Sequence, residues 1–115
     1  MTIERIKVGA RMSQAVIHGA TIYLAGQVAD DPSADVAGQT RQILARIDSL
    51  LAEAGSDKSK LLSANVWLSD ISTFDRMNAV WDEWVSPGKP PARACVESRL
   101  ARPEFKVEIM VVAAR

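Results

Sequence analysis

Three chemically active side chains lie close together in the last quarter of this chain. Arg93 and Cys95 fall within residues 90–97, which read PPARACVE, and Glu108 follows thirteen residues after the cysteine. Both segments are rich in residues typical of β-strands, where charged side chains are uncommon unless something requires them. An arginine and a carboxylate on consecutive strands predict an anion site with an acid or a base beside it.

Arg93 has two interpretations. It follows two prolines and an alanine, so its guanidinium is expected at the end of a sheet, where an extended segment becomes a strand. A guanidinium presents a planar fork that matches a carboxylate, and a charge-assisted hydrogen bond contributes about 1.5–3 kcal/mol. The alternative is a surface salt bridge to a nearby glutamate, which contributes about 0–1 kcal/mol. Spacing alone favours the salt bridge.

Glu108 lies in the most apolar strand candidate, and the period of two places Met110 and Val112 on its face. A carboxylate in such a strand must be paired, protonated or open to a cavity, because an isolated buried charge costs several kcal/mol. The alternatives are a glutamate that faces solvent from an uncovered sheet face, or a partner for Lys106 or Arg99. The residues alone do not decide among these environments for Glu108.

Cys95 and Asn78 are weaker candidates. Cys95 shares a side of its strand with Arg93, but a free cysteine is among the most often buried residues. Its usual catalytic companion, histidine, occurs once, as His18. Packing is therefore favoured for Cys95, and no metal site is expected. Asn78, near the apolar stripe of a helix, either caps a backbone group or lines a pocket.

Hydrophobic periodicity predicts the elements that position these residues. Apolar residues recur at three and four over 35–54, which indicates a helix that Gly55 ends. A second helix starts near Phe74, with Ser72 or Thr73 as its cap, and Pro87-Gly88 stops it. The strand candidates are residues 15–18 and 21–25, joined as a hairpin by Gly19-Ala20, then 62–68, 92–99 and 106–114.

This order predicts an α+β fold with a mixed sheet and both helices on one face, because each helix has only one apolar stripe to bury. The last strand is apolar on both faces, so the second face of the sheet also needs a cover. No helix remains to supply one. We therefore expect another copy of the chain to cover it.

Length and charge narrow the class of protein. The 115 residues suit a single domain, 1–115, and the formal net charge is zero. Without a basic excess, nucleic-acid and membrane partners are disfavoured. The single cysteine cannot form an internal disulfide, and the first residues do not resemble a signal peptide. We expect a cytoplasmic location and no membrane span.

Several short motifs resemble the Rid family, the reactive intermediate deaminases also called YjgF-like proteins. The resemblance covers nearly the whole chain and is closest to a short bacterial YoaB-like subgroup. The motifs that carry it are Pro91, Arg93, Cys95 and Val96, then Val107-Glu108-Ile109, Ala25-Gly26-Gln27-Val28, and Phe74 with Met77-Asn78.

The resemblance implies a chorismate-mutase-like fold with about six strands, assembled as a homotrimer with sites between subunits. It implies hydrolysis of enamine or imine intermediates, such as 2-aminoacrylate or other 2-imino acids, to 2-keto acids and ammonium, with no cofactor. Arg93 matches the arginine that holds the substrate carboxylate, and Glu108 matches the glutamate that positions or activates water. The residues that match cleft positions are Asn78, Cys95, Gly26 and Ala25.

Two positions depart from the family pattern. Ala25 stands where many members carry a serine, and Met12 stands where many carry a tyrosine. The loss of these hydroxyls bears on which imine is preferred and on the rate. A non-catalytic module that binds a keto acid or another small carboxylate is the alternative function. A ribonuclease, a third reading, is disfavoured by the neutral charge and the absence of a basic run.

Overall fold

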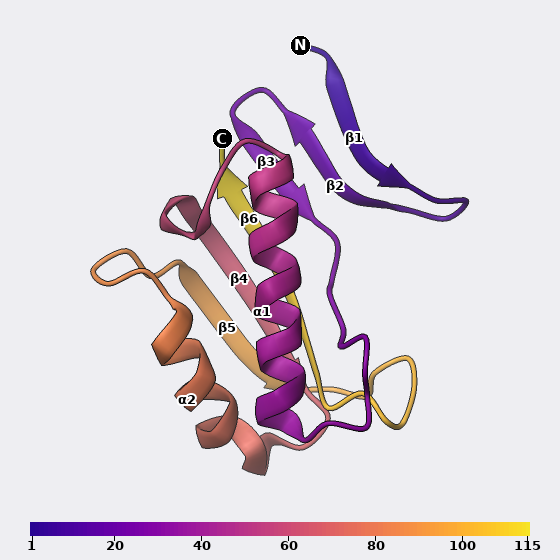
Figure 1. Ribbon diagram of the computed structural model, residues 1–115, viewed down its shortest axis with the longest axis vertical. Helices are drawn as coiled ribbons and strands as arrows, with labels where there is room; N and C mark the ends of the chain where they lie inside the picture. Colours follow the sequence, from indigo (N-terminus) through magenta and orange to yellow (C-terminus); the bar gives the residue numbers. More distant parts are fainter.

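Six strands form one mixed sheet in the order β1-β2-β3-β6-β4-β5 in the computed structural model, which describes all 115 residues (Figure 1). Only β4 and β5 pair in parallel, and the other neighbours are antiparallel. The strands are β1 (Ile3–Val8), β2 (Ser13–His18), β3 (Thr21–Leu24), β4 (Leu61–Leu68), β5 (Ala92–Glu97) and β6 (Val107–Ala114). The helices are α1 (Val36–Glu53) and α2 (Phe74–Trp84), with short 3-10 turns η1 (Lys58–Lys60) and η2 (Ile71–Thr73).

Helix α1 has the bounds that its sequence predicts. The Asp35 side chain accepts a hydrogen bond from the backbone N–H of Gly38 at 2.8 Å and thereby caps the first turn. Gly55 follows the last turn with φ of +84°, a left-handed conformation that glycine adopts without a steric penalty. The N-terminal end of α1 is therefore fixed by a side chain and its C-terminal end by backbone geometry.

Helix α2 begins differently from the prediction. Phe74 is its first residue, but Thr73 does not cap it, because the Thr73 hydroxyl donates to the carbonyl of Asp70 instead. Asp70 in turn accepts from the backbone N–H of Ser72 and caps the preceding 3-10 turn. Thr73 does occupy the N-cap position, as one of the two predicted alternatives, but it makes no side-chain capping bond because it also belongs to this extra turn, which the sequence pattern did not reveal.

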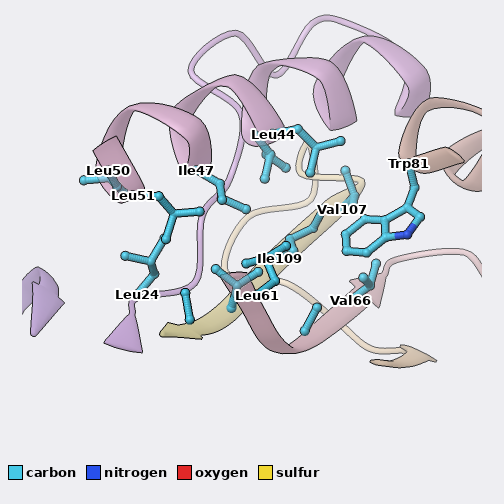
Figure 2. Packing of buried hydrophobic residues seen from close by; sticks show 14 of the residues in the cluster. Leu24, Leu44, Ile47, Leu50, Leu51, Leu61, Val66, Trp81, Val107 and Ile109 are labelled. Carbon is cyan, nitrogen blue, oxygen red and sulfur yellow. The ribbon is translucent and has the colours of Figure 1, made fainter. Parts of the chain in front are cut away.

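Both helices pack on the same face of the sheet, as predicted (Figure 1). Figure 2 shows Leu44 and Ile47 of α1 facing Val107 and Ile109 of β6, while Trp81 of α2 points into the same layer. These side chains are 5% exposed or less. Burial of this apolar layer fixes the positions of α2 and of the last strands, which carry the candidate site.

The other face of the sheet has no cover within the chain. Along β6, buried residues alternate with half-buried ones, and Glu108, Met110 and Val112 all lie on the uncovered side. Tyr23 and Val96 also point to this side and are 50% and 49% exposed. The predicted two-faced apolar pattern of the last strand is therefore present. Neither helix is long and apolar enough to cross a bilayer.

Strand β1 has no counterpart among the five predicted segments. Its sequence, IERIKV, lacks a regular alternation, and five of its six residues are exposed at the edge of the sheet. It pairs with β2 in an antiparallel hairpin and supplies the sixth strand. Because an exposed edge strand buries few side chains, its sequence shows little hydrophobic alternation, and periodicity does not predict it.

Candidate functional site

Arg93 lies on β5, the strand at one edge of the sheet, and faces the helices. Its Cα pairs in register with Ala64 of β4, which is buried beneath the helices. The guanidinium Cζ lies 5.0 Å from the ring centroid of Trp81 and 6.0 Å from that of Phe74, both on α2. Strand β5, which begins after the double proline, thus places the guanidinium at the seam between β5 and α2, which Arg93, Phe74 and Trp81 line.

The Arg93 guanidinium has no acidic partner. The two ion pairs of the chain join Arg46 to Asp30 and Arg115 to Glu4. Its Nη1 atom is buried and makes no hydrogen bond. The surface salt bridge that spacing alone favours is therefore absent, and a buried N–H donor remains available to a ligand.

Asn78 lies on the same face of α2 as the two rings. It stands four residues after Phe74 and three before Trp81, which places all three side chains on one stripe of the helix. Its Oδ1 atom is buried and unpartnered, so this oxygen caps no backbone group. The seam therefore presents one free donor, on Arg93, and one free acceptor, on Asn78.

Cys95 is half-buried on the same side of β5 as Arg93 and packs against the hydrophobic core. Burial raises the pKa of its thiol, and the nearby Arg93 charge opposes this effect only in part. A raised pKa keeps the thiol protonated at neutral pH, and a thiol is a far weaker nucleophile than a thiolate. The packing interpretation of Cys95 fits this environment.

Glu108 lies on the uncovered face of the sheet. Its Cα pairs with Trp67, whose neighbours along β4, Val66 and Leu68, face the helices. The carboxylate forms no ion pair, which excludes Lys106 and Arg99 as its partners within the chain. Burial raises the pKa of Glu108 above its ordinary value. It is thus a half-buried carboxyl group with an increased affinity for a proton.

Gly26 is in direct proximity to Glu108. A Cβ atom at Gly26 would lie 2.1 Å from Oε2 of Glu108, closer than any side-chain carbon can approach. The next residue, Gln27, fixes this segment, because its backbone exchanges hydrogen bonds of 2.8 and 3.1 Å with Ile109. Its buried side-chain amide donates to Gln14 and to the carbonyl of Ala25. Gly26 therefore lies against Glu108, and Ala25 precedes it in the chain.

Arg93 and Glu108 lie on opposite faces of the sheet within one chain. Arg93 and Val111 both pair with Ala64, so they share the helix side. Glu108 stands three residues before Val111, and an odd separation along a strand reverses the face. The structure thus brings together Arg93, Cys95 and Asn78 on one side, and Glu108 and Gly26 on the other, with Ala25 next to Gly26 in the chain.

A surface hollow of about 520 Å³ lies between α1 and the β1–β2 hairpin, and neither Arg93 nor Glu108 lines it. Two cations line it: Arg46 is paired with Asp30, whereas Lys7 forms no ion pair. No group of three or more His, Cys, Asp or Glu residues is placed to hold a metal ion. The candidate site is therefore defined by its side chains and not by this hollow.

Phe74 and Trp81 are site residues that the sequence reasoning missed. Both fit the apolar stripe of α2, and Trp81 is 5% exposed and packed in the core. The signal available in the sequence was their spacing around Asn78, which places one polar side chain between two aromatic ones on a single helix face. Their proximity to Arg93 depends on the packing of α2 against β5.

Comparisons with known proteins agree with this architecture. The model of the family described as Endoribonuclease L-PSP matches residues 2–115. A RutC family protein from Haemophilus ducreyi is 46% identical over 112 residues, 97% of this chain and 96% of the relative. The RutC family protein YoaB from Escherichia coli is 46% identical over 114 residues, 99% of each chain.

Solved structures give the same assignment. A member of the YjgF protein family from Neisseria meningitidis superposes with a TM-score of 0.98 at 46% identity, covering 100% of this chain and 96% of that one. An uncharacterized protein from Pseudomonas aeruginosa gives 0.97 at 46% identity, with 99% of each chain covered. The fold is thus that of the YjgF-type α+β proteins. This chain belongs to the RutC/YjgF family, also called Rid or L-PSP, as its motifs indicate.

Proposed function

We propose that this protein hydrolyses reactive enamine or imine intermediates, such as 2-aminoacrylate and other 2-imino acids, to 2-keto acids and ammonium without a cofactor. The observation that carries the proposal is a pair of unpartnered groups: a guanidinium with a free buried donor and a half-buried carboxyl group with a raised pKa. A 2-imino acid is already electrophilic, so orientation and proton transfer suffice to accelerate its hydrolysis.

Arg93 binds the substrate carboxylate in this mechanism. Two parallel hydrogen bonds from a guanidinium to a carboxylate fix the orientation as well as the position of the ligand. The buried Oδ1 of Asn78 lies on the same helix face as the rings next to Arg93 and accepts a hydrogen bond from the imine N–H. A keto acid has no N–H to offer, so this contact favours the substrate over the product.

Glu108 handles the water. Its carboxylate accepts a proton from a water molecule while the oxygen of that water bonds to the imine carbon, the C=N π bond breaks, and the imine nitrogen takes a proton from the surrounding solvent. The resulting carbinolamine then loses ammonia, which leaves as ammonium with the proton that Glu108 returns, and the carbonyl of the keto acid forms. Burial shifts the pKa of Glu108 towards neutral pH. A carboxyl group with such a pKa both accepts a proton and returns it more readily at that pH. Cys95, as a protonated thiol, lines the cleft.

The opposite orientation of Arg93 and Glu108 supports a site shared between subunits. One chain cannot place both groups on one small substrate, because the sheet lies between them. A second copy that covers the open face with its β5 edge and α2 brings its own Arg93 to the first copy's Glu108. We therefore propose a homotrimer with the sites in the clefts between subunits. Such an assembly also covers the exposed Tyr23 and Val96.

A coupled assay tests the activity. An amino-acid oxidase or a pyridoxal-phosphate lyase generates the imine, and keto-acid formation is followed with and without this protein. Arg93→Ala is expected to lower kcat/KM by about 10- to 100-fold, the equivalent of one lost charge-assisted interaction. Arg102→Ala, an exposed arginine on a loop, is the matched control and should retain full activity. Acceleration by no imino acid tested would contradict the proposal.

A carboxylate-binding module without turnover is the second candidate. Ala25 and Met12, which lack the hydroxyls that many family members carry at these positions, favour it, because the Glu108 side then offers fewer donors to orient a substrate. Calorimetry separates the two candidates. Binding of 2-ketobutyrate through Arg93, with no acceleration in the coupled assay, would identify the protein as a binding module.

The family description also names an endoribonuclease. The composition of this chain offers little support for that activity, because its formal net charge is zero and nucleic-acid binding draws most of its affinity from cationic contacts to phosphates. Cleavage of a single-stranded RNA by the purified protein, lost in Arg93→Ala, would reverse this assessment.

A further inference from the structure

Arg93 is held by aromatic rings rather than by an acid. Its Cζ lies 5.0 Å from the centroid of Trp81 and 6.0 Å from that of Phe74. Both distances fall within the range of about 6 Å at which a ring face attracts a cation. The two rings are seven residues apart on α2 and so project from the same side of the helix, two turns apart.

We propose that Phe74 and Trp81 form an aromatic clamp that positions Arg93 and keeps its donors free for a carboxylate. The inference rests on the proposed role of Arg93 and adds two positioning residues to it. An acidic partner would hold the guanidinium equally well, but it would occupy the N–H groups and neutralise the charge. A ring face stabilises the cation without accepting a hydrogen bond in the geometry of a carboxylate oxygen.

The buried, unpartnered Nη1 agrees with this arrangement. A buried N–H group without an acceptor is destabilising, and such groups are uncommon in folded proteins. The clamp offsets part of that cost in the free protein, and a bound carboxylate supplies the missing acceptor. The site therefore selects ligands with a free carboxylate, and an ester or an amide of the same acid should bind far more weakly.

The two rings differ in exposure, which makes the clamp testable without loss of the fold. Trp81 is 5% exposed and contributes to the core, whereas Phe74 is 37% exposed. Phe74→Leu therefore keeps an apolar side chain at the start of α2 and removes only the ring. Trp81→Phe retains a ring at the buried position, and Trp81→Leu removes it. Val80→Ala, a buried position on α2 that is not part of the clamp, is the control for general loss of stability.

Calorimetric titration with pyruvate and with its methyl ester is the binding experiment. We expect Phe74→Leu to weaken pyruvate binding about three- to tenfold and Trp81→Leu somewhat more, while Phe74→Tyr and Trp81→Phe stay within about threefold of the wild type. In the coupled assay the same losses should appear in KM with kcat nearly unchanged, because the carboxylate contact is the same in ground and transition states. Val80→Ala should lower the melting temperature and leave the dissociation constant unchanged.

Proton NMR of Arg93 separates failure of the clamp from failure of the proposed function. The Arg93 side-chain protons next to the guanidinium should show an upfield ring-current shift in the free protein, and Phe74→Leu should reduce it whether or not any ligand binds. Unshifted resonances, or pyruvate affinity unchanged in Phe74→Leu, would overturn the clamp. Shifted resonances in a protein that binds no carboxylate would leave the clamp standing and contradict the proposed role of Arg93.

Discussion

At the scale of one residue, Glu108 combines burial with a raised pKa, which suits the proton transfer proposed for it. Its carboxyl group is half-buried on an apolar sheet face without a cation beside it, and burial raises its pKa. Arg93 is the converse case, a cation whose neighbours are aromatic rings. Each group is left without a partner within the chain, and that incompleteness is the main functional signal of the molecule.

The raised pKa of Glu108 predicts a pH-dependent cost to stability. The carboxyl group of the unfolded chain titrates near pH 4.3, roughly its reference value, whereas the folded protein holds the proton to a higher pH. As pH rises through that interval, the unfolded state has lost a proton that the folded state retains, so the stability of the wild type falls. Glu108→Gln lacks this titration and should be more stable than the wild type at pH 7, with the difference vanishing below about pH 4.

Urea unfolding of the wild type and Glu108→Gln across this pH range measures the effect. Glu104→Gln, an exposed glutamate on the loop before β6, serves as the control for a simple loss of charge. A Glu108→Gln protein that is less stable than the wild type at pH 7 would show that the carboxylate has a stabilising partner.

Short segments set the geometry of the site at the scale of elements. Gly26 gives Glu108 room, and a Cβ there would lie 2.1 Å from its Oε2. Because that atom is the end of a flexible side chain, Gly26→Ala should displace the carboxylate and leave the fold intact. We expect activity to fall about 10- to 100-fold, as misplacement of a reacting group by about 1 Å does elsewhere.

Gly9→Ala is the matched control, because a Cβ at Gly9 would meet only the Met12 carbonyl at 3.5 Å, an ordinary contact. Activity in the coupled assay and circular dichroism of both variants give the comparison. Full activity of Gly26→Ala would mean that catalysis does not depend on the observed position of Glu108.

Gln39 connects α1 to the loop before β6. Its buried amide donates to the carbonyls of Pro32, Ala34 and Glu104 and accepts from the N–H of Lys106. Gln39→Leu leaves these groups without partners and should lower the free energy of unfolding by about 2–4 kcal/mol. Gln42→Ala, which loses two hydrogen bonds to the exposed Asp31, should lower it by about 1 kcal/mol or less. Equal losses in chemical denaturation would contradict this role of Gln39.

The sequence predicts those helices and strands whose buried faces give a regular hydrophobic pattern. The stripe of α1, its glycine terminator, the Gly19-Ala20 hairpin and the two-faced apolar character of β6 are all confirmed. Strand β1 and the 3-10 turn before α2 were not predicted, because one is an exposed edge and the other is stabilised by Asp70 rather than by periodicity.

The site is less predictable than the fold. Period-two counting correctly places Cys95 beside Arg93 and Met110 beside Glu108. The register between β4, β5 and β6, which puts Arg93 and Glu108 on opposite faces, depends on long-range pairing that no local pattern encodes. The same holds for the contact of Arg93 with Phe74 and Trp81.

At the scale of the whole molecule, the proposed assembly makes a single chain half of two different sites. One edge carries the guanidinium, and the open face carries the carboxyl group together with exposed Tyr23 and Val96. In the proposed homotrimer, a closed ring of copies would join each edge to a neighbour's open face and leave none of these groups unmatched. A stable monomer at micromolar concentration, measured by light scattering, would contradict the proposed site between subunits.

Complementation between inactive subunits tests the shared site most directly. Arg93→Ala and Glu108→Gln proteins, each of which should keep only a small fraction of the wild-type activity alone, are co-expressed and the mixed assemblies assayed for imine hydrolysis. If Arg93 and Glu108 of one site come from different chains, random assembly restores about one quarter of the sites, and activity should recover to about that fraction of the wild type. A mixture of Arg93→Ala with Asn78→Ala, which alter the same half of the site, should not recover. A first mixture no more active than its parents would contradict the shared site.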